Sequence, residues 1–386
     1  MSSALRSRFP LIYKEFKHCM ISSCSRRCSS SVPGTQPQRS YLKPIITSVG
    51  CGIVAGSLYA YYSSQTNNDP TNLNPAIVAN SPTLKSHPPI QISRKIVIPN
   101  DTTGLEITLF QYPTCPFCCK VRAFLDYHGL SYNVVEVNPV LRQQIKWSQY
   151  KKVPILLIKD GDEYVQLNDS SMIISTLSTY LKNRQTCITE ITQYYPTMTL
   201  TESDSGKKTD VVNKYHVMLA NTDQNQIDID KDERKWRKWA DEVLVHTLSP
   251  NVYRTKDEAL QAFQWFSEVG EWERLFSRWE QVLVVYVGAY AMWMIGKKLK
   301  KRHNLKDNVR ESLYDECRTW VKEVNKKGKF CGGSSPNLAD LAVYGVLSSI
   351  EGCQAFKELL ENTKIGRWYN DMKQACQNHS GIVLSR

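Results

Sequence analysis

The chain has 386 residues, a formal net charge of +12, and 41% hydrophobic and 10% aromatic residues. This composition is that of a folded protein and allows one large domain or two ordinary domains. The 12 cysteines are too dilute and too irregularly spaced for a secreted disulfide scaffold.

Most of the positive charge lies in the N-terminal part of the chain. Residues 1–43 contain eight basic residues and one acidic residue, whereas residues 101–386 carry a net charge of only about +3. A basic nucleic-acid surface on the folded part is therefore not expected. The Ser- and Arg-rich leader at 1–43 is typical of an organelle transit peptide, or of a basic tail beside a membrane span.

The next segment is free of charge. Ile45 to Tyr62 is an uncharged run of 18 residues, which is just long enough to cross a hydrocarbon layer as a helix. We expect a single transmembrane anchor at 44–63, and the alternative is a cleaved or peripheral presequence. Residues 64–103 are rich in Pro, Asn and Ser and are interpreted as a linker.

Periodic segments begin near residue 104 and predict an α/β domain at 104–183. Their order is β-α-β-α-β-β-α, which describes a four-stranded mixed sheet flanked by helices. The expected strands are 106–112, 131–138, 153–158 and 163–167, and the expected helices are 119–129, 142–150 and 170–181.

The remainder of the chain divides into two parts. Residues 184–230 are polar and irregular and are interpreted as a connection, and almost all of 231–378 has helical periodicity. The uncharged segment Gln281–Gly296 is short for a membrane span. A buried helix or a subunit contact is favoured there over a second crossing.

The motif "YPTCPFCCKV" places Cys115 and Cys118 between a predicted strand and a predicted helix. A zinc site usually needs a second pair of ligands, and no second paired motif is present. A structural disulfide is the other bland alternative. The N-terminus of a helix lowers a thiol pKa, so Cys115 is the candidate reactive thiol. Cys118, one turn inside the helix, is a supporting or resolving group, and Cys119 is expected to pack in the core.

Two further features follow later strands of the same sheet. Val153–Pro154 precedes an apolar strand, where a proline can be cis and can shape a backbone edge beside the thiol. Asp169 and Ser170 open the next predicted helix, where N–H groups and hydroxyls could hold a carboxylate or could simply cap the helix. Together with the thiol, these features predict a ligand groove.

These residues carry a resemblance to a known family. The strand and helix order, the CPFC motif, Val153–Pro154 and Asp169–Ser170 resemble a glutaredoxin or glutathione-transferase N-terminal domain. The segment "PNLADLAVYGVLSSIEG" resembles the transferase C-terminal domain. "SPNVYRT" and "KDNVRESLY" further resemble the membrane-associated prostaglandin E synthases, over about residues 104–372. The implied fold is an α/β thioredoxin-like domain followed by an all-α transferase-like domain, behind an N-terminal membrane span.

The resemblance implies isomerisation of prostaglandin H2, or a related lipid endoperoxide, to prostaglandin E2. Cys115 would be the thiol that engages the endoperoxide, with Tyr112 and Phe117 beside it and Cys118 as a less essential partner. A polarisable thiol suits this chemistry.

The resemblance also implies glutathione and haem as cofactors. Glutathione would lie along Val153 and Pro154, with its γ-glutamyl end at Asp169 and Ser170. Haem iron would take the glutathione thiolate as its axial ligand and could redirect the enzyme to endoperoxide degradation, yielding malondialdehyde and a C17 hydroxy acid. His246 is a candidate haem-pocket residue, although a lone helical histidine is more often structural. No protein metal site is expected.

The resemblance further implies a homodimer at the Golgi membrane with a soluble cytoplasmic form, whereas the basic leader favours mitochondria. Two other functions stay open at this point. One is a glutaredoxin-like thiol–disulfide oxidoreductase that uses Cys115 and Cys118 directly, and the other is a membrane-tethered glutathione- or haem-binding module. A plain glutaredoxin needs no helical second domain, which favours the isomerase.

Overall fold

The structure is a computed structural model that describes residues 77–202, 206–219 and 224–381. The predicted leader at 1–43 and the predicted anchor at 44–63 lie outside the described residues. The chain divides into two units at residues 51 and 52, and everything described here belongs to the second unit.

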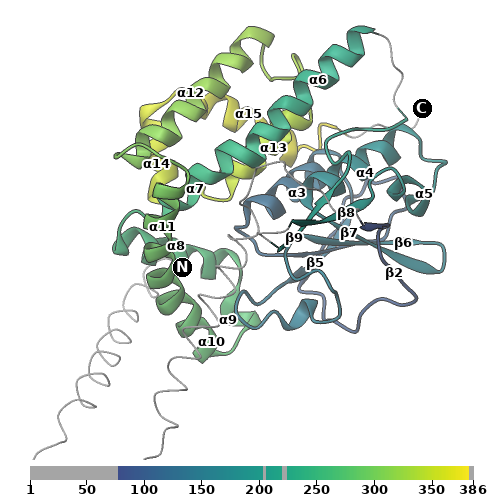
Figure 1. The fold of residues 1–386 in the computed structure, drawn as a ribbon, viewed down its shortest axis with the longest axis horizontal. Coiled ribbons are helices and arrows are strands. Elements are labelled where there is room, and N and C mark those ends of the chain that lie inside the picture. Colours follow the sequence, from purple (N-terminus) through teal and green to yellow (C-terminus); the bar gives the residue numbers. More distant parts are fainter. Residues whose placement is uncertain (1–76, 203–205, 220–223, 382–386) are drawn as a thin grey trace, which may run out of the picture. The chain divides into compact units, whose positions relative to one another are not determined.

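A six-stranded mixed sheet forms the first half of the described chain (Figure 1), with the order β2-β7-β6-β4-β5-β3. Only β4 and β5 are parallel neighbours, because helix α3 (Pro116–Tyr127) connects them as a crossover. All five residues of β4 are buried, as expected for a central strand. The strands are β2 (Thr83–Leu84), β3 (Arg94–Ile96), β4 (Ile107–Gln111), β5 (Tyr132–Glu136), β6 (Ile155–Asp160) and β7 (Glu163–Asn168).

The sheet is wider than the sequence predicted. The four expected strands are present as β4 to β7, and β6 and β7 form the expected hairpin around Asp160 and Gly161. The two edge strands β2 and β3 come from the segment interpreted as a linker at 64–103, and they pair antiparallel with β7 and β5. They were missed because strands of two and three residues are too short to show alternation.

The helix expected at 142–150 is not formed. The segment contains one 3₁₀ turn, η1 (Gln143–Ile145), which is preceded by Arg142 in the left-handed region at φ 49°. The Asn138 side chain accepts hydrogen bonds from the backbone N–H groups of Val140 and Leu141. This local turn competes with helix initiation, as short polar side chains commonly do.

The connection at 184–230 is also more ordered than predicted. It contains α5 (Ile188–Thr192) and the strands β8 (Thr197–Glu202) and β9 (Gly206–Val211), which pair antiparallel. Strand β1 (Ile77–Ala79) adds to β8, so the expected linker and the expected connection meet in a second, three-stranded sheet.

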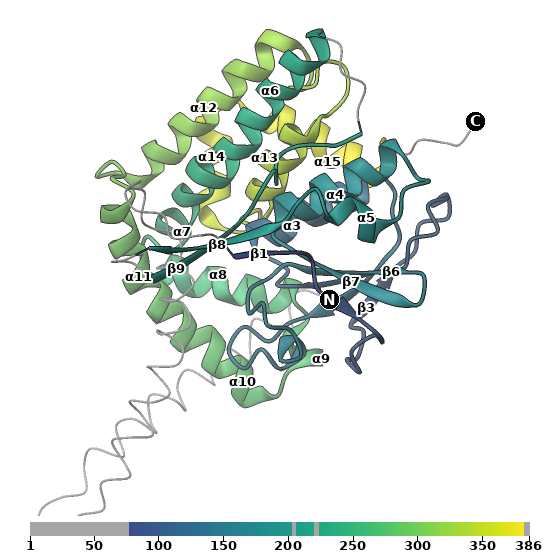
Figure 2. The ribbon, with the colours of Figure 1, turned by 45° about the vertical axis from the view of Figure 1, so that its right-hand side comes forward.

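The chain from Gln224 onward is helical, as the periodicity predicted. Its elements are α6 (Gln224–Trp239), the π-helical turn η2 (Ala240–Leu244), α7 (Val245–Val252), α8 (Lys256–Val269), α9 (Trp272–Leu275), α10 (Arg278–Val282), the π-helical turn η3 (Leu283–Gly288), α11 (Ala289–Arg302), α12 (Val309–Lys327), α13 (Leu338–Ser348), α14 (Gln354–Asn362) and α15 (Ile365–Gln377). Figures 1 and 2 both show α3 and α4 (Ser170–Lys182) between the six-stranded sheet and helices α6 and α13.

The uncharged segment Gln281–Gly296 belongs to one continuous helical stretch from Arg278 to Arg302. Among the described residues this is the one helix long and apolar enough to cross a membrane, a test that core helices of soluble proteins also pass. Of its most apolar 18-residue segment, 39% is buried within the fold.

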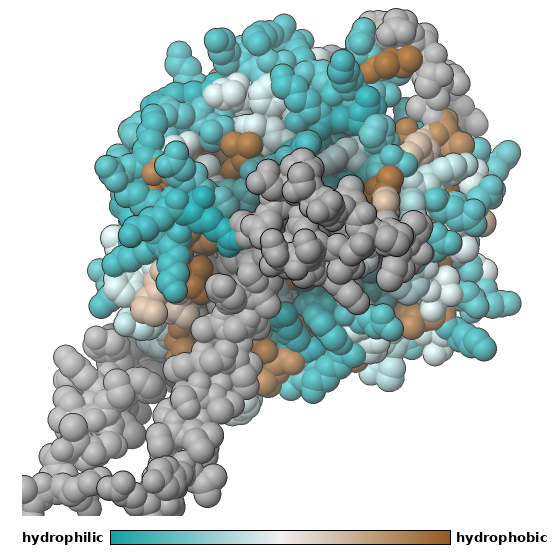
Figure 3. Space-filling model, viewed as in Figure 1, coloured by the Kyte–Doolittle hydropathy of each residue, from teal (hydrophilic) through white to brown (hydrophobic). Residues whose placement is uncertain are grey.

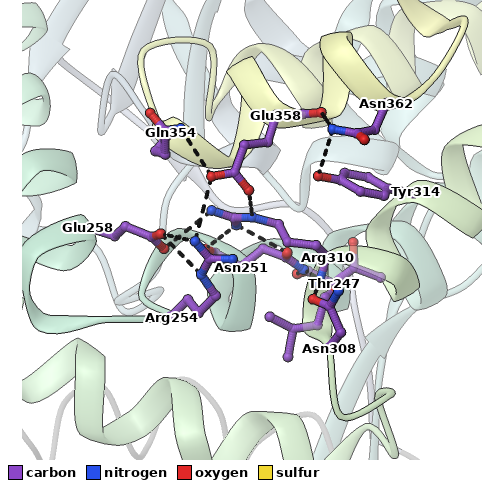
Figure 4. Close-up of polar contacts among 11 residues, drawn as sticks. Thr247, Asn251, Arg254, Glu258, Asn308, Arg310, Tyr314, Gln354, Glu358 and Asn362 are labelled. Atoms are coloured by element: carbon purple, nitrogen blue, oxygen red, sulfur yellow. Dashed lines mark hydrogen bonds and ion pairs between the residues drawn. The ribbon is translucent and has the colours of Figure 1, made fainter.

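A buried polar cluster holds the helical region together around Arg310 of α12 (Figure 4). The Arg310 guanidinium donates to the Asn251 backbone oxygen at 2.6 Å and to Glu358 Oε2 at 2.6 Å, and it lies 3.3 Å from Glu258 Oε2. The Asn251 side chain donates in turn to the Val309 backbone oxygen at 2.9 Å. The motifs "SPNVYRT" and "KDNVRESLY" therefore meet in this cluster, and it fixes the C-terminal end of α7.

Helices α3 and α13 cross closely because α13 carries Gly345 at the contact. A Cβ atom at Gly345 would lie 2.6 Å from the Lys120 backbone nitrogen and 2.9 Å from the Cys119 carbonyl carbon. Real Cβ atoms do not approach backbone this closely, so the glycine is required for the two helices to pack.

We expect Gly345→Ala to lower the free energy of unfolding by about 1–3 kcal/mol, because overpacking a rigid helix contact costs more than the gain in helix propensity. Urea unfolding followed by circular dichroism measures the change. Gly366→Ala is the matched control, since a Cβ there would meet only Leu360 Cδ2 at 3.5 Å. An equal effect of the two substitutions would contradict the close-packing argument.

Candidate active site

Cys115 occupies the N-cap position of α3, and Pro116 is the first helical residue. Proline suits this position because its missing N–H would have no intrahelical partner and its φ is already helical. Cys115 is half-buried, whereas Cys118 is fully buried among the residues of the second core cluster on the sheet. The helix start thus leaves one thiol accessible and packs the other beneath it.

Hydrogen bonds to its sulfur lower the pKa of Cys115. The Cys118 thiol contributes most, and the backbone N–H groups of Cys118 and Phe117 add to it, together with the positive charge of Arg122. Burial and the shared hydrogen bond raise the pKa of Cys118 well above its usual range, and the Tyr112 backbone N–H donates to its sulfur. Cys118 is therefore held as a neutral donor, and Cys115 is the thiol that ionises.

The remaining buried cysteines have the opposite character. Burial raises the pKa of Cys119 and Cys317, and it raises the pKa of Cys331 and Cys353 to about 12. Cys119 donates instead to the Pro113 backbone oxygen at 3.3 Å, consistent with the packing role expected for it.

Cys115 opens into a cavity of about 370 Å³ between the α/β domain and the helical region. Tyr112 and Phe117 line it beside the thiol, as the sequence placed them. The wall opposite is apolar and comes from α7, α8, α9, η3, α11 and the segment after α13; it consists of Val245, Leu248, Val252, Phe263, Phe266, Trp272, Val284, Met292, Leu299 and Ile350.

One side of the cavity is basic. Arg142, Lys151 and Lys152 line it near the thiol, and none of the described residues that line the cavity is Asp or Glu. Arg142 and Lys151 are held in place by bonds to backbone carbonyls, such as Arg142 Nη1 to Lys151 O at 3.0 Å. The sequence analysis did not predict that these basic residues line the cavity. The Lys151–Lys152 pair directly before Val153 could have indicated it. The cavity can accept an elongated apolar molecule that carries a carboxylate.

The residues predicted to bind glutathione lie in two places. Val153 lines the cavity, and the peptide bond between Val153 and Pro154 is cis. Asp169 and Ser170 lie outside the lining, at the N-terminus of α4. The Tyr150 hydroxyl accepts a hydrogen bond from the Asp169 backbone N–H; burial raises its pKa, and the nearby charges of Asp169 and Cys115 raise it further.

Asp169 caps α4 and is held from several sides. Its side chain accepts from the N–H groups of Ser171 and Met172 at 2.8 and 3.2 Å, and its backbone has φ 71°. Lys214, from the segment after β9, lies 3.8 Å from its second carboxylate oxygen. Asp169 therefore does cap the helix, and its second carboxylate oxygen faces Lys214.

A buried ion pair lies beneath this helix terminus. Lys120 of α3 pairs with Asp241 in the π-helical turn η2 and donates to the hydroxyls of Ser170 and Ser171 at 3.3 and 3.0 Å. Burial raises the pKa of Asp241, but the Lys120 charge and the hydrogen bonds from Lys120 and Ser171 outweigh it, so the pKa lies below its usual range. Ser170 therefore accepts a hydrogen bond from Lys120, a contact between residues 50 positions apart that no local pattern predicts.

His246 lines the cavity and stacks on His303, with ring centroids 4.2 Å apart and planes at 12°. Burial, then the charges of His303 and Arg302, lower the pKa of His246 to about 4. It is therefore neutral at physiological pH. Among the described residues no group of three His, Cys, Asp or Glu side chains could hold a metal ion.

The chain is similar in sequence to known proteins. The family "Glutathione S-transferase, N-terminal domain" matches residues 109–180. The chain is 50% identical over 285 residues to "Prostaglandin E synthase 2" of Danio rerio, covering 72% of this chain and 73% of that protein. It is 49% identical over 285 residues to the Mus musculus protein of the same name, covering 73% of each.

Solved structures of glutathione transferases are also similar to the chain. Glutathione S-transferase III in apo form gives a TM-score of 0.38 at 14% identity, over 73% of this chain and 98% of that one. Glutathione transferase F7 from Populus trichocarpa gives 0.40 at 12% identity, over 72% of this chain and 99% of that one.

The thiol at the start of the first helix of an α/β domain, followed by a helical region, defines a glutathione-transferase-like protein. Half of the aligned residues are identical over nearly three quarters of the relatives' length. The chain belongs to the prostaglandin E synthase 2 family.

We expect Cys118→Ala to raise the pKa of the Cys115 thiol, because the substitution removes the hydrogen bond that contributes most to lowering it. Cys118→Ser, which keeps a donor, should shift it far less. The pH dependence of iodoacetamide labelling at Cys115, followed by peptide mass spectrometry, measures the midpoint.

Because the thiolate is the reacting form, a raised pKa moves the labelling midpoint to higher pH and slows labelling near neutrality. Labelling at the exposed Cys187 in the same sample is the internal control. A midpoint that is unchanged in Cys118→Ala would show that the Cys118 thiol does not stabilise the thiolate.

Proposed function

We propose that the protein is a prostaglandin E synthase that isomerises prostaglandin H2, or a related lipid endoperoxide, to prostaglandin E2 through the Cys115 thiol. The observation that carries the proposal is a thiol of lowered pKa facing an apolar cavity of about 370 Å³ with one basic side. Such a cavity suits a fatty-acid derivative, which combines hydrocarbon chains with a carboxylate. The names of the relatives at 50% and 49% identity support the same reaction.

The reaction needs no external oxidant or reductant. The Cys115 thiolate attacks one endoperoxide oxygen and forms an S–O bond, the O–O bond breaks, and the other oxygen leaves with the electron pair, takes a proton and becomes the hydroxyl. The carbon that carries the sulfur-bound oxygen then loses its proton, and the C–H electron pair forms the ketone as the O–S bond breaks and returns the thiolate. A polarisable thiolate is suited to this because it can attack an oxygen of the weak O–O bond and can leave again.

Each predicted residue has a place in this scheme. Tyr112 and Phe117 contact the substrate beside the thiol, and burial raises the pKa of Tyr112 to about 12, so its hydroxyl stays protonated as a donor. Cys118 keeps Cys115 ionisable rather than forming a disulfide with it. Arg142 and Lys151 lie where the substrate carboxylate is expected.

Glutathione fits the same surface. Its cysteinyl backbone would pair along Val153 at the cis-Pro154 edge, and its γ-glutamyl end would reach Asp169 and the N-terminus of α4. When bound, it supplies a second thiol beside Cys115. Haem is proposed from the family resemblance alone: its iron would be bound through the glutathione thiolate, with His246 in the wall of the pocket. The family likewise motivates the proposals of a homodimer and a Golgi or mitochondrial membrane.

A second candidate is a thiol–disulfide oxidoreductase, which the direct contact between the Cys115 and Cys118 thiols favours. The two functions differ in their need for Cys118. An oxidoreductase that forms a disulfide requires both sulfurs, whereas the isomerase requires from Cys118 only a hydrogen-bond donor.

We expect the purified full chain to convert prostaglandin H2 to prostaglandin E2 above uncatalysed decay, with and without added glutathione and haem. Cys115→Ser should lower kcat/KM by about 100-fold or more, the scale typical for loss of a positioned catalytic group. Cys118→Ser should keep most of the activity. Product analysis by mass spectrometry resolves prostaglandin E2 from malondialdehyde and the C17 hydroxy acid.

The outcome that would overturn the isomerase is absence of prostaglandin E2 above background in the wild-type chain. Turnover of a disulfide substrate that disappears in Cys118→Ser would then favour the oxidoreductase. Glutathione-dependent appearance of a Soret band without turnover of either substrate would leave the binding module.

A further inference from the structure

We propose that the outer face of the helical stretch Arg278–Arg302 docks onto an anionic lipid surface. The stretch would lie on the membrane rather than cross it. The proposal concerns a surface remote from the thiol, and it is independent of the proposed isomerase activity.

The inner face of this stretch belongs to the fold. Val284, Met292 and Leu299 are 4–5% exposed and line the cavity opposite Cys115. Gly288 packs against the Phe263 ring, where a Cβ atom would come within 2.7 Å. A helix that walls the cavity in this way cannot leave the core to span a bilayer.

The outer face is apolar and exposed. Trp279, Tyr290 and Met294 have exposed fractions of 61%, 53% and 46%, which makes them three of the most exposed large hydrophobic residues among those described. In Figure 3, brown and pale patches interrupt the hydrophilic surface on the lower left, over the region of α10 and α11 in Figure 1. Trp and Tyr are the side chains preferred at membrane–water interfaces.

The same face carries positive charge. Tyr290, Met294, Lys297 and Lys301 stand at positions i, i+4, i+7 and i+11, so they share one side of α11. Lys297 Nζ lies 4.0 Å from the centroid of the Trp293 ring, and Lys256 Nζ of α8 lies 4.7 Å from it on the same surface.

The charge favours a lipid surface over a second copy of the chain. Residues 297–302 contain five basic residues and no acidic residue, and Lys300 pairs with Asp307. A symmetric contact through this face would bring two such clusters together, at a cost from like-charge repulsion. An anionic bilayer instead attracts each basic residue and accepts the aromatic rings between its headgroups.

The proposed docking surface lies on the other side of the helix from the cavity. The helix that would rest on the membrane is also a wall of the cavity, so only this helix would separate the bilayer from the cavity.

The test uses the full chain incubated with vesicles and a photo-crosslinking residue at one site. With Met294→p-benzoylphenylalanine, irradiation on phosphatidylcholine vesicles containing phosphatidylserine should give a phospholipid adduct detectable by mass spectrometry. Leu360→p-benzoylphenylalanine on α14 is the matched control, since Leu360 is 40% exposed and should give little adduct.

Charge reversal tests the electrostatic part. Lys297→Glu, Lys298→Glu and Lys301→Glu together should lower the adduct yield at position 294 by well over fivefold, because the loss of each basic residue beside an anionic surface weakens binding by about fivefold. Reversal of the exposed Lys322, Lys357 and Lys364 is the control with equal change of net charge.

Each remaining result overturns the docking. Protein–protein adducts at position 294 would assign this face to a subunit contact, and equal lipid yields at positions 294 and 360 would remove the preference for this face. Equal yields with and without phosphatidylserine would remove the anionic specificity. Prostaglandin turnover of the charge-reversed chain in detergent should be unchanged, so failure of the docking and failure of the proposed activity give different results.

Discussion

The buried ion pair between Lys120 and Asp241 is the contact on which the site depends. Lys120 lies on α3, a little over one turn beyond Cys115, and Asp241 lies in the π-helical turn at the start of the cavity-lining helices. Separating two such charges from water is costly, and the cost is offset only when every polar group finds a partner. Ser171 and Tyr215 complete the set, donating to Asp241 at 2.6 and 3.1 Å. Neither charge can leave without stranding the other, so the thiol helix is fixed against the helical region.

A second buried polar cluster, around Arg310, holds the opposite wall of the cavity in place. Helix α7 contributes Val245, His246, Leu248 and Val252 to the cavity, and Asn251 in its last turn is bound by Arg310. Arg310 also pairs with Glu258 at the start of α8 and with Glu358 on α14 (Figure 4). The motif "KDNVRESLY" thus supports the cavity from behind through Arg310, whereas "SPNVYRT" both binds Arg310 through Asn251 and contributes Val252 to the cavity wall. The contacts of Arg310 hold these helices in position, and an apolar pocket keeps its volume only when its walls cannot collapse.

The sequence predicted those parts of the fold whose signals are local. Strand and helix periodicity, the proline after Val153 and the cap at Asp169 each depend on a few neighbouring residues, and each is present. The hairpin β8–β9 was missed because its strands are polar, although the alternating "TMTLTE" before "SDSG" was a usable signal. The Lys120–Asp241 pair could not be predicted, because it joins residues 121 positions apart and only the tertiary fold brings them together.

The thiol site likewise has one part that the local sequence predicts and one part that only the tertiary structure shows. The position of Cys115 at a helix start follows from the motif, and with it the expectation of a lowered pKa. The function of Cys118 does not, because a CxxC spacing serves a redox pair and a donor–acceptor pair equally well. Only the burial of Cys118 and its bond to Cys115 distinguish them: a sulfur that is fully buried and holds its proton stabilises its neighbour's charge but is poorly placed to attack a disulfide.

The two helical stretches that wall the cavity share an irregularity. Each contains a π-helical turn, Ala240–Leu244 in one and Leu283–Gly288 in the other. A π turn inserts one residue into the helical repeat, so the faces before and after it are rotated relative to a regular helix. In the first stretch the turn carries Asp241 to Lys120, and in the second it carries Val284 to the cavity and Gly288 to Phe263. Beyond the second turn, α11 turns Met292 and Leu299 inward and leaves Tyr290, Met294 and Lys297 outside. One helix therefore presents an apolar wall to the cavity and an aromatic, basic face to the exterior, which is the arrangement that the proposed docking to a lipid surface requires.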